Sequence, residues 1–148
     1  GISLFKIKEG LEKTTTEKGR LQLLETDRFT ILDDSYNANP HSMKAAIDTL
    51  KTFSGEKIAV LGSMAELGAN SRALHQEIGE YANQAGLDKL YTIGEHSNHY
   101  NGELFPDIES LYIQLNECHL GATILIKGSR MMKLDELVDI LSKTSISS

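Results

Sequence analysis

The sequence has 148 residues, of which 40% are hydrophobic and 24% are charged, as in one ordinary globular domain. Its net charge of -6 would repel a phosphate backbone, so nucleic acid is not expected as a partner. Its single cysteine, Cys118, cannot form an internal disulfide, and no apolar run approaches the roughly 20 residues of a membrane helix. We therefore expect one cytoplasmic domain, residues 1–148, with no membrane insertion.

Five short apolar segments predict strands. Those at 20–25 and 29–32 lie so close together that they imply an antiparallel hairpin. The runs at 57–61, 89–93 and 123–126 each stop at or just before a glycine, as buried parallel strands that open into loops do.

Apolar residues at helical spacing fill the intervals between the strands. They predict helices around residues 43–50, 74–85, 108–118 and 134–141. Asn39-Pro40 or Ser42 suits the start of the first helix, and the small polar tail from Ser142 is expected to be loose. The alternation predicts an α/β fold with a Rossmann-like, mostly parallel sheet, helices on both faces and an antiparallel N-terminal hairpin. Ligands of such sheets bind at the carboxyl ends of the strands, so the loops there carry the candidate motifs.

The densest polar segment is Asp33 to Ser42, directly after a predicted strand. A carboxylate at this place can accept the hydroxyls of a ribose, Asn37 or Asn39 can read an adenine edge, and Tyr36 can stack on its face. The same residue types also favour turns and helix starts, so the residues alone favour a capped turn over a nucleotide site.

A second polar motif, Lys127-Gly128-Ser129-Arg130, follows the last predicted strand. Two cations flank a Gly-Ser turn at a predicted helix start, where backbone N–H groups favour an anion and the arginine suits a carboxylate or phosphate. The alternative is a pair of solvated surface charges.

Two weaker motifs remain, the glycine-bounded loop Gly62 to Gly68 and the basic turn Lys18-Gly19-Arg20. The loop can be a plain connection, and His75 in the following helix is more simply a packing residue than a catalyst. The sequence contains no phosphate-binding loop, no dinucleotide fingerprint, and no catalytic triad or metal spacing that can be argued. A complete active site is therefore not expected within this chain.

Together the four motifs resemble the C-terminal domain of the Mur ligases, in the branch that joins D-alanyl-D-alanine to a UDP-N-acetylmuramoyl tripeptide. Their order and spacing agree over nearly the whole chain. The resemblance implies one domain of an ATP-dependent ligase of peptidoglycan precursor synthesis. The ATP phosphate loop and the Mg²⁺ ligands would lie on a central domain absent from this chain. The chain alone is therefore expected to be inactive.

The resemblance also implies roles for individual residues. Arg20 would be the catalytic arginine that reaches the γ-phosphate of ATP, and Asp34 would bind the ribose. The residues around the adenine would be Tyr36, Asn37 and Asn39, and those at the D-alanyl-D-alanine carboxylate would be Lys127, Ser129 and Arg130. Ser63 stands where this family usually has Asp. If that Asp only caps the next helix, Ser can replace it at little cost; if it positions substrate, this chain would handle its acceptor differently.

Two other functions stay open. A folylpolyglutamate synthase-like ligase domain would share Arg20 and Asp34 but should lack the Tyr36–Asn39 run and the Lys127–Arg130 turn. A non-catalytic, receiver-like binding module would suit the paired acids after a strand, but the strand ending at Leu61 carries no acid.

Overall fold

The computed structural model describes residues 21–26, 28–35, 38–65, 67–117, 121–129 and 132–147. They form a six-stranded sheet in the order β1-β2-β6-β3-β4-β5. The strands are β1 (Gln22–Glu25), β2 (Phe29–Asp34), β3 (Lys57–Gly62), β4 (Lys89–Ile93), β5 (Glu103–Phe105) and β6 (Ala122–Lys127). β1 and β2 pair antiparallel, and the remaining pairs are parallel. The predicted fold class, including the N-terminal hairpin, is confirmed.

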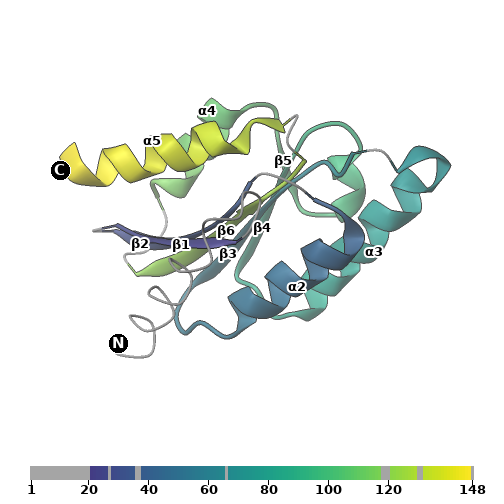
Figure 1. Ribbon diagram of the computed structural model, residues 1–148, viewed down its shortest axis with the longest axis horizontal. Coiled ribbons are helices and arrows are strands. Elements are labelled where there is room, and N and C mark those ends of the chain that lie inside the picture. Colours follow the sequence, from purple (N-terminus) through teal and green to yellow (C-terminus); the bar gives the residue numbers. More distant parts are fainter. Residues whose placement is uncertain are drawn as a thin grey trace.

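Helices cover both faces of the sheet (Figure 1). The helices are α2 (Pro40–Lys51), α3 (Ser71–Gln84), α4 (Ile108–Leu115) and α5 (Leu134–Ser147), with short 3₁₀ turns η1 (Gly68–Asn70) and η2 (Ser97–Tyr100). α4 and α5 lie on one face, and α2 and α3 lie on the other (Figure 1). Right-handed crossovers between parallel strands produce this three-layer arrangement.

The central strand β6 is buried at every position. Its side chains alternate between two apolar clusters, with Ile124 and Ile126 packed towards α4 and α5, and Leu125 packed towards α2 and α3. Lys127 continues the second alternation, so its side chain belongs to the α2 face of the sheet. The cationic side chain of Lys127 therefore lies beside the apolar cluster under α2 and α3, where a buried charge requires a partner of opposite charge.

Four details of the sequence prediction were wrong. β2 continues through Asp33 and Asp34, so the two acids are strand residues that point to opposite faces. The three-residue strand β5 was not predicted, because so short a segment has no readable alternation. α4 ends at Leu115, since Asn116 begins the turn after it, and α5 runs on to Ser147 past the tail expected from Ser142.

Candidate functional site

The carboxyl ends of four adjacent parallel strands form one edge of the sheet. In spatial order these ends are Asp34 of β2, Lys127 of β6, Gly62 of β3 and Ile93 of β4. Three of the sequence motifs therefore converge here, although they are far apart along the chain. This is the edge at which open α/β sheets bind their ligands.

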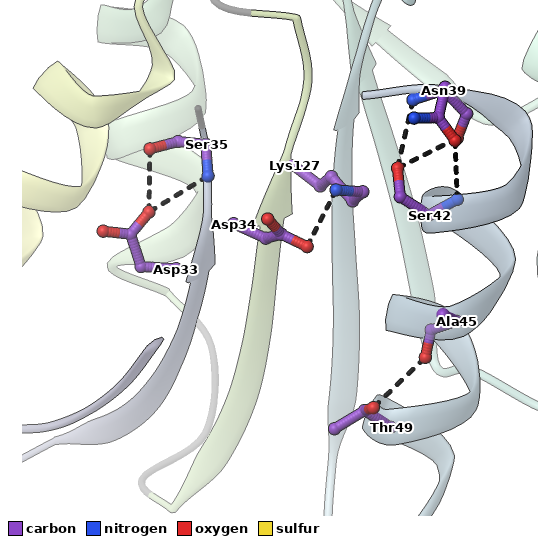
Figure 2. Close-up of polar contacts among 8 residues, drawn as sticks. All are labelled: Asp33, Asp34, Ser35, Asn39, Ser42, Ala45, Thr49 and Lys127. Carbon is purple, nitrogen blue, oxygen red and sulfur yellow. Dashed lines mark hydrogen bonds and ion pairs between the residues drawn. The ribbon is translucent and has the colours of Figure 1, made fainter. Parts of the chain in front are cut away.

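Asp34 and Lys127 form a buried ion pair between β2 and β6 (Figure 2). The two residues are register partners, and the Lys127 Nζ donates to Asp34 Oδ2 at 2.7 Å. The Lys127 side chain is only 2% exposed, and the Asp34 side chain is only 9% exposed. An amine and a carboxylate can be buried so fully only when each offsets the other's charge. The sequence assigned them to two different ligands, whereas the structure joins them.

The pKa of Asp34 is raised above its ordinary value, mainly because burial penalises the carboxylate. The charge and hydrogen bond of Lys127 act in the opposite direction, and the neighbouring Asp33 adds a smaller increase. Asp33 itself is used locally, since its Oδ1 accepts from the Ser35 N–H at 3.1 Å and from the Ser35 hydroxyl at 2.7 Å. The two adjacent acids therefore differ in role: Asp33 shapes the strand end, and Asp34 faces the α2 side with a cation.

Asn39 is the N-cap of α2, as the alternative interpretation of this segment predicted (Figure 2). Its Oδ1 accepts the Ser42 N–H at 2.9 Å, and the Ser42 hydroxyl oxygen accepts the Asn39 N–H at 3.1 Å. Pro40 occupies the first turn, where its missing N–H costs nothing. Capping uses one lone pair of the carbonyl oxygen of the Asn39 side chain, and its amide nitrogen is left for an adenine contact. That contact stays a prediction.

Beside the β6 end that carries Lys127, the loops that follow β3, β4 and β6 line a partly open cavity of about 310 Å³. Its lining combines apolar and polar groups: Ser63, Met64, Ala65, Leu67, Gly68, Ser71, Glu95, His96, Ser129 and Met132. The volume lies at the low end of the range of about 300–1,000 Å³ for small-molecule sites. Of the residues predicted to bind substrate, Ser129 lines this cavity. Glu95, His96 and Met132 were not predicted, because the first two are exposed loop residues and the third is a partly buried residue between β6 and α5, and none of them belongs to a periodic pattern.

Ser63 ties three strand ends together. Its hydroxyl donates to the Glu95 carbonyl oxygen, its N–H donates to the Ile93 carbonyl oxygen at 3.1 Å, and its own carbonyl oxygen accepts the Ser129 N–H at 2.9 Å. The N-cap position of α3 belongs to Asn70. A capping role for Ser63 is therefore wrong, and its hydroxyl is a donor within the cavity wall.

His75 is fully buried, which confirms the packing interpretation over a catalytic one. Its Nε2 accepts the Met64 N–H at 3.0 Å, and its Nδ1 lies 2.7 Å from the Ser71 carbonyl oxygen. Because a carbonyl oxygen can only accept, Nδ1 carries the proton and the ring is neutral. The pKa of His75 is lowered, first by burial and then by the charges of His96 and His99, against an increase from the Ser71 hydrogen bond.

Four of the predicted site residues, Arg20, Tyr36, Asn37 and Arg130, lie outside the described residues, as does the Lys18-Gly19 turn. Within the described part of the chain, no group of three or more His, Cys, Asp or Glu side chains could hold a metal ion. The Mg²⁺ expectation concerned another domain and stays a prediction. None of the described helices is both long and apolar enough to cross a membrane.

Comparison with known proteins gives consistent matches. The family model "Mur ligase, glutamate ligase domain" matches residues 19–130. The UDP-N-acetylmuramoyl-tripeptide--D-alanyl-D-alanine ligase of Escherichia coli K12 is 40% identical over 97% of this chain and 34% of its own length. The crystal structure of MurF ligase from Thermotoga maritima in complex with ADP matches with a TM-score of 0.78 and 30% identity, over 84% of this chain and 30% of that one. A MurF structure from Acinetobacter baumannii matches with the same TM-score and 29% identity, over 95% of this chain and 33% of that one.

The chain spans about a third of the length of the curated relatives that it matches.

Proposed function

Because the chain belongs to the Mur ligase family, in the domain described as the glutamate ligase domain, we propose that it is the acceptor-binding domain of an ATP-dependent ligase that joins D-alanyl-D-alanine to a UDP-N-acetylmuramoyl tripeptide. One observation carries the proposal. The Asp34–Lys127 pair lies beside the cavity that contains Ser129, so the residues assigned to the nucleotide and to the acceptor occupy adjacent strand ends. ATP use is supported by the relative crystallised with ADP. A cytoplasmic location is a further part of the proposal.

The cavity has the chemistry of a small dipeptide site. Met64, Leu67 and Met132 supply apolar contacts for two methyl side chains, and the Ser129 hydroxyl can donate to a carboxylate. The Glu95 carboxylate at the cavity rim is suited to the ammonium group of the free dipeptide. Arg130, which follows Ser129 in the chain, is proposed as the second group at the dipeptide carboxylate.

The proposed reaction is acyl activation. The tripeptide carboxylate takes the γ-phosphoryl group of ATP, and ADP leaves. The ammonium group of the dipeptide then loses a proton, the resulting amine attacks the carbonyl carbon of the acyl phosphate, and the amide forms as phosphate and a second amine proton leave. Within this chain, Arg20 would offset charge on the transferred phosphoryl group, and Asp34 would accept ribose hydroxyls, with Tyr36, Asn37 and Asn39 around the adenine. Mg²⁺ would be held by the other domains. Because Asp34 already binds Lys127, a ribose bound there would share its carboxylate with that amine.

The proposal is tested by an amide NMR titration of this chain with D-alanyl-D-alanine and, in parallel, with L-alanyl-L-alanine. We expect shifts at Met64, Glu95 and Ser129 with the D,D dipeptide, and at least about tenfold weaker binding of the L,L dipeptide, because a site that reads two methyl groups and two charges is chiral. Ser129→Ala should weaken the D,D response. Equal responses to both dipeptides, or shifts elsewhere on the domain, would remove the acceptor site from this cavity.

A further inference from the structure

Residues 63–65 and 67–71, which connect β3 to α3, contribute to the wall of the cavity, and one buried side chain forms hydrogen bonds to both ends of this connection. Met64 near its start and Ser71 at its end both line the cavity. The buried ring of His75 bonds to both, through Nε2 to the Met64 N–H and through Nδ1 to the Ser71 carbonyl oxygen. Each ring nitrogen therefore fixes one end of the connection.

A second buried side chain holds the strand end just before this connection. The Tyr100 hydroxyl donates to the Gly62 carbonyl oxygen at 2.8 Å, and Tyr100 is fully buried. Its ring packs on the His75 ring, with the centroids 4.9 Å apart and the planes tilted by 56°. Three backbone groups around the cavity, at Gly62, Met64 and Ser71, are thus held by two side chains in contact.

Loss of the hydrogen bonds that His75 and Tyr100 make to the backbone would change the shape of the cavity. The backbone N–H of Met64 accompanies a side chain that lines the cavity, whereas the imidazole itself is absent from the lining. Without the ring, this N–H would have to turn towards water in the cavity or stay without a partner. The first result moves the cavity wall, and the second destabilises the wall in its present position. Both leave Asp34 and Lys127 in place on β2 and β6.

We propose that His75 and Tyr100 are positioning residues that set the shape of the acceptor cavity, and thereby the affinity of the ligase for D-alanyl-D-alanine. The inference rests on the proposed function, because it assigns the cavity to that dipeptide. Neither side chain touches the substrate. They act through the Gly62–Met64 backbone, in contrast to Ser129, which lines the cavity directly.

The test uses the full-length ligase that contains this domain and measures kcat and the KM of each substrate. His75→Leu removes both ring bonds, and His75→Gln keeps an acceptor near the Met64 N–H. We expect His75→Leu to raise the KM for D-alanyl-D-alanine on the order of tenfold to a hundredfold, with the KM for ATP unchanged, since small misplacements in a site are costly. His75→Gln should restore most of the affinity.

A milder pair of variants covers the case in which His75→Leu fails to fold. Tyr100→Phe removes one hydroxyl behind the cavity and should raise the KM for the dipeptide several-fold. Tyr81→Phe is the matched control, because it removes a hydroxyl that bonds Asp48 on the exposed side of the same helix layer. It should leave every constant unchanged.

The possible outcomes distinguish the positioning role of His75 and Tyr100 from the proposed function of the domain. Variants that lower kcat and all substrate affinities together, or a Tyr100→Phe enzyme that behaves as Tyr81→Phe does, would overturn the positioning role alone. A wild-type enzyme that does not use D-alanyl-D-alanine would overturn the proposed function, and with it the role given to these two residues.

Discussion

Two parts of the same sheet edge hold their polar groups in different ways. At the ends of β2 and β6, a full positive charge and a full negative charge lie buried against each other, in Lys127 and Asp34. Around the end of β3 and the start of α3, the neutral side chains His75 and Tyr100 hold backbone groups by hydrogen bonds. The charged part depends on both of its members, whereas each bond of the neutral part can be removed separately. The Asp34–Lys127 pair is therefore suited to connecting the proposed nucleotide and acceptor sites. The hydrogen bonds of His75 and Tyr100 are suited to setting the shape of the acceptor cavity.

Lys127→Met sharpens this comparison most strongly. It removes the cation and leaves the Asp34 carboxylate buried without it, which should lower the free energy of unfolding by about 3–5 kcal/mol and raise the pKa of Asp34 further. Urea unfolding of the chain measures this loss. Lys44→Met is the matched control, because it breaks the exposed Lys44–Glu77 pair and should cost about 1 kcal/mol or less.

The double variant Asp34→Leu/Lys127→Met distinguishes charge from packing. Replacing both members by apolar groups should recover much of the stability lost in Lys127→Met, since no uncompensated charge remains. Equal losses in the Lys127→Met and Lys44→Met chains would show that the buried pair is not held by its charges.

Gly79→Ala tests the packing of η2, which carries Tyr100, against α3, which carries His75. An added Cβ on Gly79 would overlap the carbonyl group of Tyr100, so η2 would have to move away from α3. A Gly-to-Ala change inside a helix ordinarily stabilises by about 1 kcal/mol, whereas here we expect a loss of about 1–3 kcal/mol. The sign of the change in the free energy of unfolding therefore shows whether η2 is packed tightly against Gly79. Glu80→Ala, at the exposed neighbour in α3, should stay within about 0.5 kcal/mol of the wild type.

The fold was largely readable from the sequence because its signals are local. Apolar runs gave the strands, and the positions Met43, Ala46, Ile47 and Leu50 gave the buried face of α2. Asn39-Pro40 gave the start of that helix through its capping preference. The failures were short or terminal: β5 has three residues, and no local signal distinguishes the last turns of α5 from a frayed tail.

The sequence predicted which loops form the site but not which of their side chains bond to one another, because the order of strands in a sheet is not a local property of the sequence. β2 and β6 are neighbours, which joins Asp34 to Lys127 across 93 residues. The sequence placed one at the nucleotide and the other at the acceptor, with no sign that they share a bond. His75 was read correctly as a packing residue, yet its two backbone partners depend on how α3 meets the β3 exit, which periodicity does not encode.

Acidification should cause the smallest of these changes in the free energy of unfolding, and the change should have opposite signs at His75 and at Asp34. The lowered pKa of His75 means that its stabilising bonds are fully present above the unfolded value of about 6.5. Below that pH the unfolded chain takes up a proton that the folded ring resists, so the free energy of unfolding should fall. Around the ring, the charges of His96 and of His99 in η2 oppose its protonation, the Ser71 carbonyl oxygen already accepts the Nδ1 proton, and the Tyr100 ring packs against it.

A comparison with His75→Gln isolates this contribution. Both chains keep His96 and His99, so the difference between their unfolding free energies, followed from about pH 8 to about pH 5, reports the ring alone. The wild type should lose more stability than the variant on acidification, because a protonated Nε2 would turn a donor towards the Met64 N–H. The raised pKa of Asp34 has the opposite sign: protonation there is favoured by the folded state, so it cannot mimic the loss. A constant difference across the range would mean that His75 does not hold the Met64 amide as a neutral acceptor.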